Sequence, residues 1–179
     1  MKFNLLLICA IIAYSMCSNY SERTVWMHLK SYGMTKECVA GFMGNLYAES
    51  GIRSDVYELN AHTDPRLTDL EYVNRVGSGQ LDFVSDGIGF GVAQWKDRKR
   101  KQNLLDACRG RISDMVCQLT FIYKELSYDY AFLLDTLRSV RDVSECTQIV
   151  MLKYLNLGSN TAELNTRIQY AQGFYDRYA

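Results

Sequence analysis

A glutamate at the end of an apolar segment is the first residue placed to do acid–base chemistry. Apolar residues precede it at the spacing of one helical face: Val39, Phe42, Met43, Leu46 and Tyr47. Thr35 can cap such a helix at its start, and Gly51 can end it in the left-handed conformation. Glu49 is then partly buried where the helix ends, and burial favours the uncharged carboxyl from which a general acid donates its proton. The alternative is an ordinary exposed glutamate near a helix end.

A glycine-rich run follows at residues 86–95, which read DGIGFGVAQW. Gly87, Gly89 and Gly91 stand at alternate positions, which lets the backbone turn tightly and approach a ligand closely. Gln94 lies between an alanine and a tryptophan, where its amide needs hydrogen-bond partners. The run is not a dinucleotide-binding motif: it has no third glycine at the offset that this motif requires, no strand–helix unit flanks it, and no ribose-binding acid follows at the expected distance. The alternative is a plain turn before the next helix, with its tryptophan in the core.

These two segments, followed by a basic helix, resemble the phage tail-associated lysozyme family of the lysozyme and lytic transglycosylase superfamily. Residues 117–126 (CQLTFIYKEL) resemble the next helix of that family, and RIQYA at 167–171, with Tyr175 beyond it, resembles the last helix. The resemblance covers residues 24–178. The chain differs in its longer segment between Glu49 and Gly87, and in Lys96-Asp97, where many relatives have Thr-Gly.

The resemblance implies a mainly α, lysozyme-like α (α+β) single domain. It implies a muramidase that cleaves the β-1,4 bond between N-acetylmuramic acid and N-acetylglucosamine in peptidoglycan. Glu49 would be the catalytic residue that protonates the leaving glycosidic oxygen, and no cofactor or metal is expected. The implied substrate-binding residues are Ser50, Gly89, Gly91, Gln94 and Tyr170. A lytic transglycosylase with the same site, a glycan-binding module without catalysis and a structural protein on this scaffold remain as alternatives.

A second carboxylate, if the reaction uses one, has three candidates in the sequence. Asp55, Asp64 and Asp86 flank the two motifs, and spacing does not choose among them. Many members of the superfamily work with one glutamate and the acetamido group of the substrate.

Composition predicts one domain and a neutral surface. The 179 residues, 48% of them hydrophobic, can bury one sizeable core. Lys and Arg together number 20, as do Asp and Glu, so no strong field recruits nucleic acid or an anionic membrane. The expected partner is the glycan strand of peptidoglycan, bound by a monomer. The basic run at 96–101 is interpreted as a solvated helix face, with contact to an acidic wall polymer as the alternative.

Residues 1–17 have the pattern of a secretory signal peptide. Lys2 precedes a short apolar stretch at 5–13, and Ser15 and Ser18 flank possible cleavage points. The stretch is too short to span a bilayer. The catalytic domain would therefore comprise residues 18–179, and the mature protein would be secreted or held in a secretory or lysosomal compartment without an integral membrane segment.

The cysteines fit an oxidising compartment. Cys9 lies in the predicted leader, and the fate of Cys17 depends on where cleavage occurs. The other four predict two disulfides with three possible pairings: Cys38, Cys108, Cys117 and Cys146. Cys108 and Cys117 bracket a turn around Gly110, which favours a local pair between them and would leave Cys38 with Cys146, but the sequence does not choose among the three pairings. A Cys–His peptidase or metal site using His28 or His62 is the alternative, but neither histidine has a recognisable nucleophile context.

Hydrophobic periodicity predicts a chain that is mostly helical. A short opening helix ends at Gly33, and residues 52–66 are expected to form a loop. Further helices are expected at 67–76, 97–108, 113–126, 129–139, 144–156 and 161–177.

Overall fold

The computed structural model describes residues 21–58 and 67–179. The predicted signal segment 1–17 lies outside the described residues, as do Cys9, Cys17, His62 and Asp64. After an opening helix at 21–31, the helices are α2 (Lys36–Ser50), α3 (Asp69–Gly77), α4 (Arg98–Ala107), α5 (Met115–Tyr128), α6 (Ala131–Leu137), α7 (Val143–Ile149), the π-helix η1 (Val150–Tyr154) and α8 (Thr161–Tyr178). The mainly α prediction is confirmed. None of the described helices is long and apolar enough to cross a bilayer.

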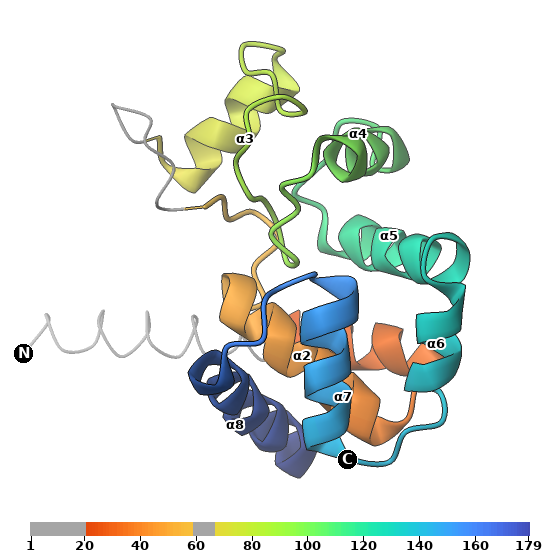
Figure 1. Ribbon diagram of the computed structural model, residues 1–179. Coiled ribbons are helices and arrows are strands. Elements are labelled where there is room, and N and C mark those ends of the chain that lie inside the picture. The colour runs from red at the N-terminus through yellow and green to blue at the C-terminus, as the bar shows by residue number, and fades with distance from the viewer. Residues whose placement is uncertain (1–20, 59–66) are drawn as a thin grey trace, which may run out of the picture.

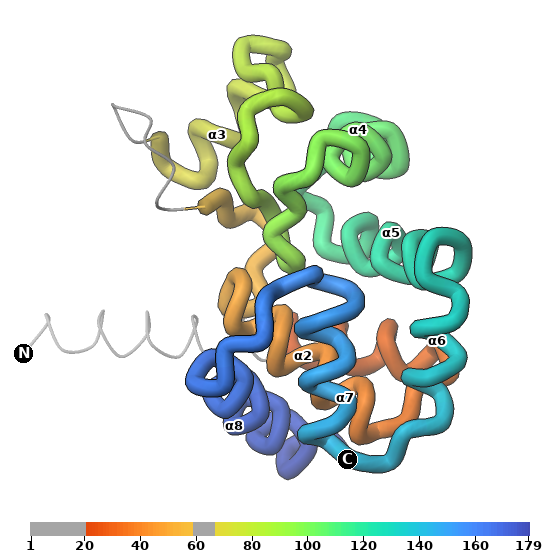
Figure 2. Tube along the Cα trace, in the orientation of Figure 1, coloured from red at the N-terminus to blue at the C-terminus, as the bar shows by residue number. Residues whose placement is uncertain are grey.

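Helix α2 is the centre of the larger group of helices. In Figures 1 and 2, α7 and α8 lie beside it in the lower half of the molecule, while α3 and α4 occupy the upper half. Every residue from Cys38 to Leu46 is buried, so the expectation of a helix with a single apolar face was wrong. The reason is that neighbouring helices cover α2 on several sides, and a helix in that position is apolar around most of its circumference. Both predicted ends are confirmed: the Thr35 side chain accepts from the Cys38 N–H, and Gly51 has φ 64°.

Two glycines of α2 let its neighbours come unusually close. A Cβ atom on Gly41 would lie 2.8 Å from the backbone nitrogen of Thr147 in α7. A Cβ atom on Gly44 would lie 2.6 Å from the carbonyl oxygen of Arg167 in α8. Any side chain at these positions would push the backbones of α7 and α8 away. The glycines therefore determine how near the last helix lies to α2.

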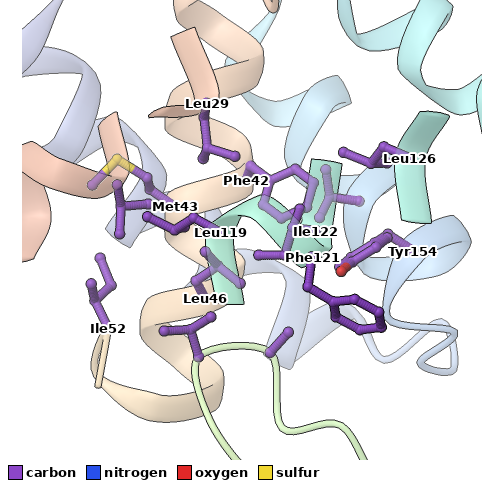
Figure 3. Packing of buried hydrophobic residues seen from close by; sticks show 14 of the residues in the cluster. Leu29, Phe42, Met43, Leu46, Ile52, Leu119, Phe121, Ile122, Leu126 and Tyr154 are labelled. Atoms are coloured by element: carbon purple, nitrogen blue, oxygen red, sulfur yellow. The ribbon is translucent and has the colours of Figure 1, made fainter. Parts of the chain in front are cut away.

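The apolar core includes residues of α2, α5 and η1. Figure 3 shows Phe42 and Leu46 of α2 facing Leu119 and Ile122 of α5, with Tyr154 of η1 at one side. All five side chains are fully buried. Burying one such large apolar side chain stabilises the fold by roughly 1.5–3 kcal/mol. This packing keeps the end of α2 rigid where it approaches the glycine-rich run.

The predicted helices are largely present, and the differences have physical causes. The expected helix 144–156 is divided into α7 and η1, which ends at Tyr154.

The basic run is only partly a solvated face, because Lys101 is fully buried and paired with Asp86. Its Nζ also donates to the Ile88 carbonyl at 2.7 Å. Burial lowers the pKa of Lys101, although the carboxylate of Asp86 opposes that shift. This ion pair anchors α4 to the glycine-rich run.

Both predicted disulfides are present. Cys108 and Cys117 join the end of α4 to the start of α5, across 9 residues. Cys38 and Cys146 join α2 to α7, across 108 residues. The second bond ties together two helices of the central group that are far apart in the sequence.

The two disulfides should differ in their contribution to stability. Replacing Cys38 and Cys146 by alanine should lower the free energy of unfolding more than replacing Cys108 and Cys117. Their loops span 108 and 9 residues, and the entropy of loop closure predicts a difference of about 2 kcal/mol. Urea denaturation of the two double-alanine variants measures it. Equal losses would show that loop length does not govern the stability of this fold.

Candidate active site

A cavity of about 930 Å³ opens where several helix ends converge. Its walls come from the end of α2, the glycine-rich run, the start of α4, the end of α5, the segment after η1 and the start of α8. We call it the main cavity. Of the predicted site residues, it brings together Glu49, Gly89 and Gln94. Two segments that the sequence separates by more than thirty residues therefore face one space, as the resemblance implied.

Glu49 is held by an arginine from the last helix. Its Oε1 accepts from Nη2 of Arg167 at 2.6 Å, and its side chain is 16% exposed. The same nitrogen donates to Oε1 of Glu163 at 2.5 Å. The two carboxylate oxygens bind one nitrogen, so they lie within about 5 Å of each other. Two carboxylates at the edge of the main cavity thus share one cation.

The guanidinium of Arg167 is fully engaged. Its Nε donates to Glu163 at 3.1 Å, and its Nη1 donates to the carbonyl and side-chain oxygens of Asn45 at 3.3 and 3.2 Å. Asn45 is itself fully buried and donates to the Gly41 and Thr147 carbonyls. A guanidinium has five N–H donors in a fixed planar arrangement, and here five hydrogen bonds hold it. Arg167 therefore positions Glu49 rigidly.

Gln94 has a fixed orientation in the wall of the main cavity. Its Nε2 donates to the Val56 carbonyl at 3.3 Å and to the Gly91 carbonyl at 3.0 Å. Its backbone has φ 47°, an uncommon conformation for a residue with a side chain. Because the amide nitrogen is engaged by the backbone, the amide oxygen is the polar atom of Gln94 that can accept from water or from a sugar.

Gly91 and Ser50 support the wall and do not line the main cavity. Gly91 has φ 76°, and a Cβ atom there would lie 2.6 Å from Oε1 of Gln118. The buried side chain of Gln118 accepts from the Val92 N–H and donates to the carbonyls of Ser54 and Ile112. The Ser50 hydroxyl bonds to the Leu46 and Val92 carbonyls, both at 3.0 Å. Ser50 thus connects the end of α2 with the glycine-rich run.

Tyr170, the remaining predicted binding residue, lies beside a smaller neighbouring hollow and not in the wall of the main cavity.

Glu58 is a carboxylate of the main cavity that the sequence did not indicate. It accepts from the Gly89 N–H at 3.1 Å and from Nζ of Lys96 at 2.9 Å. The hydrogen bond from Lys96, helped by the Gly89 N–H, holds the pKa of Glu58 below its usual range. Glu58 is therefore a stable anion that is hydrogen-bonded to the glycine-rich run. The one signal that could have revealed it is its backbone pairing with Gly89, and pairing of that kind leaves no local pattern in a sequence.

Two of the three aspartates considered as second carboxylates lie away from the main cavity. Asp55 is exposed and pairs with Arg53 at 3.1 Å. Asp86 binds the buried Lys101 and accepts from the Tyr72 hydroxyl at 2.5 Å. Glu58 and Glu163, in contrast, both line the main cavity.

The floor of the main cavity contains a buried carboxylate network. Glu125 accepts from Nε of Arg100 at 2.6 Å, from the Trp95 indole N–H at 3.1 Å and from the Tyr154 hydroxyl at 2.6 Å. Burial and the charge of Glu125 raise the pKa of Tyr154 well above its usual value, so its hydroxyl remains a donor. The network fixes the start of α4 against α5. Trp95 is thus in the core, as one interpretation of the sequence expected.

A family model described as phage tail lysozyme matches residues 21–178. The chain belongs to the phage tail lysozyme family. The resemblance inferred from the motifs is thereby confirmed, over almost the same range. Phage tail lysozymes are peptidoglycan-cleaving glycosidases, so family membership indicates a peptidoglycan-lytic enzyme. No curated protein matches the chain.

Arg167 should not be replaceable by lysine in this phage tail lysozyme domain. Arg167→Lys keeps the charge but cannot form the five hydrogen bonds to Asn45, Glu49 and Glu163. Losing several buried hydrogen bonds should lower the free energy of unfolding by about 1–3 kcal/mol and reduce lysis. Urea denaturation and a turbidity assay measure the two effects. The control is Arg111→Lys, whose side chain is 77% exposed and which should behave as wild type.

Proposed function

We propose that this protein is a secreted muramidase that cleaves the β-1,4 bond between N-acetylmuramic acid and N-acetylglucosamine, with Glu49 as the general acid. The observation that carries the proposal is the carboxyl of Glu49, positioned by Arg167 at the edge of the main cavity. A general acid must lie within hydrogen-bond reach of the atom that it protonates, on a rigid element. The end of α2 meets that requirement, because the core holds the helix and Arg167 holds the side chain.

Arg167 and Glu163 support the proton transfer by balancing charge. While Glu49 carries the proton, Glu163 remains as the counter-charge of Arg167, at 2.5 Å. When Glu49 gives the proton to the leaving glycosidic oxygen, the carboxylate that forms is already beside the guanidinium. The protein therefore stabilises the product state of this step without moving a charged group.

The positive charge that develops on the sugar needs an anion and a nucleophile. Glu58 is an anion in the wall of the main cavity and can stabilise a cationic sugar or activate water. Gln94 offers its amide oxygen to a water or to a polar group of the scissile sugar. Gly89 lets the backbone approach the glycan, whereas Ser50 and Gly91 contribute by maintaining the wall. Glu49, now a carboxylate, can take a proton from the attacking water.

Export of the protein is part of the proposal. The two disulfides suit an oxidising compartment, and the leader-like residues 1–17 suit secretion or delivery to a lysosomal compartment. Peptidoglycan strands would then be met outside the cytosol by a single-domain monomer. The competing possibilities are a lytic transglycosylase with the same acid and an inactive glycan-binding module.

Glu49→Gln should nearly abolish lysis while leaving the fold intact. The amide keeps the shape of the side chain and removes the donated proton, which is expected to cost about 10²- to 10⁴-fold in rate. A turbidity assay on cell walls measures the rate, and circular dichroism checks the fold. Glu145→Gln, at an exposed position of α7, should lyse as wild type does.

A cell-wall pull-down completes that test. Wild type that binds walls without lysing them would favour the inactive module, and neither binding nor lysis would favour a purely structural role. Turnover of Glu49→Gln within a few-fold of wild type would mean that another residue is the acid.

The products should carry reducing ends. Water held near Gln94 would give a hydrolysed muropeptide, whereas attack by the muramic acid's own hydroxyl gives a 1,6-anhydro product that is lighter by one water. Mass spectrometry of digested peptidoglycan distinguishes the two. A pool dominated by anhydro ends would assign the chain to the lytic transglycosylases and leave the role of Glu49 unchanged.

A further inference from the structure

Lys96 is the cation that contacts Glu58 in the wall of the main cavity. Its Nζ donates to Oε2 of Glu58 at 2.9 Å and to Oε1 at 3.2 Å, so it binds both oxygens of the carboxylate. Both side chains line the main cavity. Lys96 directly precedes the N-cap residue of α4, whereas Glu58 belongs to the segment that follows α2. The ion pair therefore connects two segments of the cavity wall.

The backbone of the glycine-rich run holds Glu58 as well. The Gly89 N–H donates to Oε2 of Glu58 at 3.1 Å, and the Glu58 N–H donates to the Gly89 carbonyl at 2.8 Å. Main chain and side chain of Glu58 are thus both bound to the same glycine. Of the two groups that donate to the carboxylate, only Lys96 carries a charge. Substitution of Lys96 therefore removes the charge and leaves the backbone contacts in place.

The other cations of the main cavity have different roles. Arg100 and Arg167 are each engaged by other carboxylates. Lys99 also lines the cavity, but within residues 21–58 and 67–179 it forms no ion pair. Lys101 is buried in an ion pair of its own and acts on Glu58 through its charge alone. The charged groups that act on Glu58 are therefore Lys96, in direct contact, and Lys101, without contact.

The ion pair affects the charge of Glu58 more than the stability of the fold. The side chains of Lys96 and Glu58 are 60% and 36% exposed, and exposed pairs of this kind contribute about 0–1 kcal/mol to stability. The hydrogen bond from Lys96 is nevertheless the main cause that holds the pKa of Glu58 below its usual range. Removal of Lys96 should therefore change the chemistry of the site and leave the fold intact.

The proposed reaction needs its two carboxyl groups in opposite states. Glu49 must carry the proton that it donates, whereas Glu58 can stabilise a cationic sugar or activate water only as an anion. In acid, a carboxylate without a cation of its own would be protonated together with Glu49. A lysine bound to Glu58 keeps the second group charged while the first is protonated.

We propose that Lys96 is a positioning residue that holds Glu58 as the second carboxylate of the site and so extends cleavage to lower pH. This inference rests on the proposed function, because it concerns the partner of Glu49 in the same reaction. Lys96 takes no part in the chemical step and acts only through Glu58. The rate is lost as pH falls through the lowered pKa of Glu58. The acid limb of the wild-type pH profile should therefore lie below 4.5, the ordinary value for a glutamate carboxyl.

The pH dependence of kcat/KM on soluble peptidoglycan fragments tests this role. Lys96→Met removes the charge and keeps the length of the side chain, so the acid limb should move to higher pH. Lys96→Arg keeps the charge and should restore the limb. The control is Lys99→Met, which removes a charge from the same cavity without touching Glu58 and should leave the limb in place. Glu58→Gln should lower the rate by about 10²- to 10⁴-fold.

The failures of the two proposals are distinguishable. Equal acid limbs of Lys96→Met and Lys99→Met, with both variants folded by circular dichroism, would overturn the inference and leave Glu49 as the acid. A Glu58→Gln variant as active as wild type would also overturn it.

NMR titration of the Glu58 carboxyl carbon gives a readout without turnover. Its midpoint should rise in Lys96→Met and stay unchanged in Lys99→Met. An unchanged midpoint in Lys96→Met would overturn the inference whether or not the protein lyses walls. An inactive wild type in which the midpoint still rises with Lys96→Met would overturn the muramidase and support the hold of Lys96 on Glu58.

Discussion

The close contact between α2 and α8 at Gly44 is the constraint on which the site depends. Gly44 has no side chain, and the backbone of α8 comes so close that a Cβ atom on Gly44 would lie only 2.6 Å from the Arg167 carbonyl oxygen. This proximity lets the Arg167 side chain turn back to both Asn45 and Glu49. A larger residue at Gly44 would move the last helix outward and take the guanidinium out of reach. A steric feature of the backbone thus determines which charged group lies beside Glu49.

Buried side-chain amides also hold the site in place. Asn45 orients Arg167, and Gln118 holds the glycine-rich run by bonding to three separate backbone segments. Such groups are costly to bury unless their polar atoms are paired. Here the pairing joins segments that form no regular sheet within residues 21–58 and 67–179. The side-chain amides of Asn45 and Gln118 therefore connect segments that backbone pairing does not join. This explains how two isolated β-bridges suffice to shape the wall that faces Glu49.

Local signals in the sequence predicted the local features well. The caps of α2, the position of Glu49 at its end and the turn at Gly91 all follow from residue type and spacing, and the two disulfides followed from spacing together with compartment. The roles of Arg167 and Glu58 could not be predicted in this way, because each depends on a partner brought close only by tertiary packing. Lys101 is the clearest case: in the sequence it belongs to an exposed basic run, and burial against Asp86 reverses that interpretation. The predicted leader stays a prediction.

Glu49 and Arg167 are 118 residues apart in the sequence, so the site forms late during synthesis of the chain. In a chain that is made from its N-terminus, Glu49 is synthesised early and Arg167 only with α8, so the two can pair only when α8 is present. Until then neither the shared cation nor the packing of α8 on α2 exists, and the walls of the main cavity are incomplete. A nascent or truncated product that has not yet formed α8 therefore lacks an assembled site.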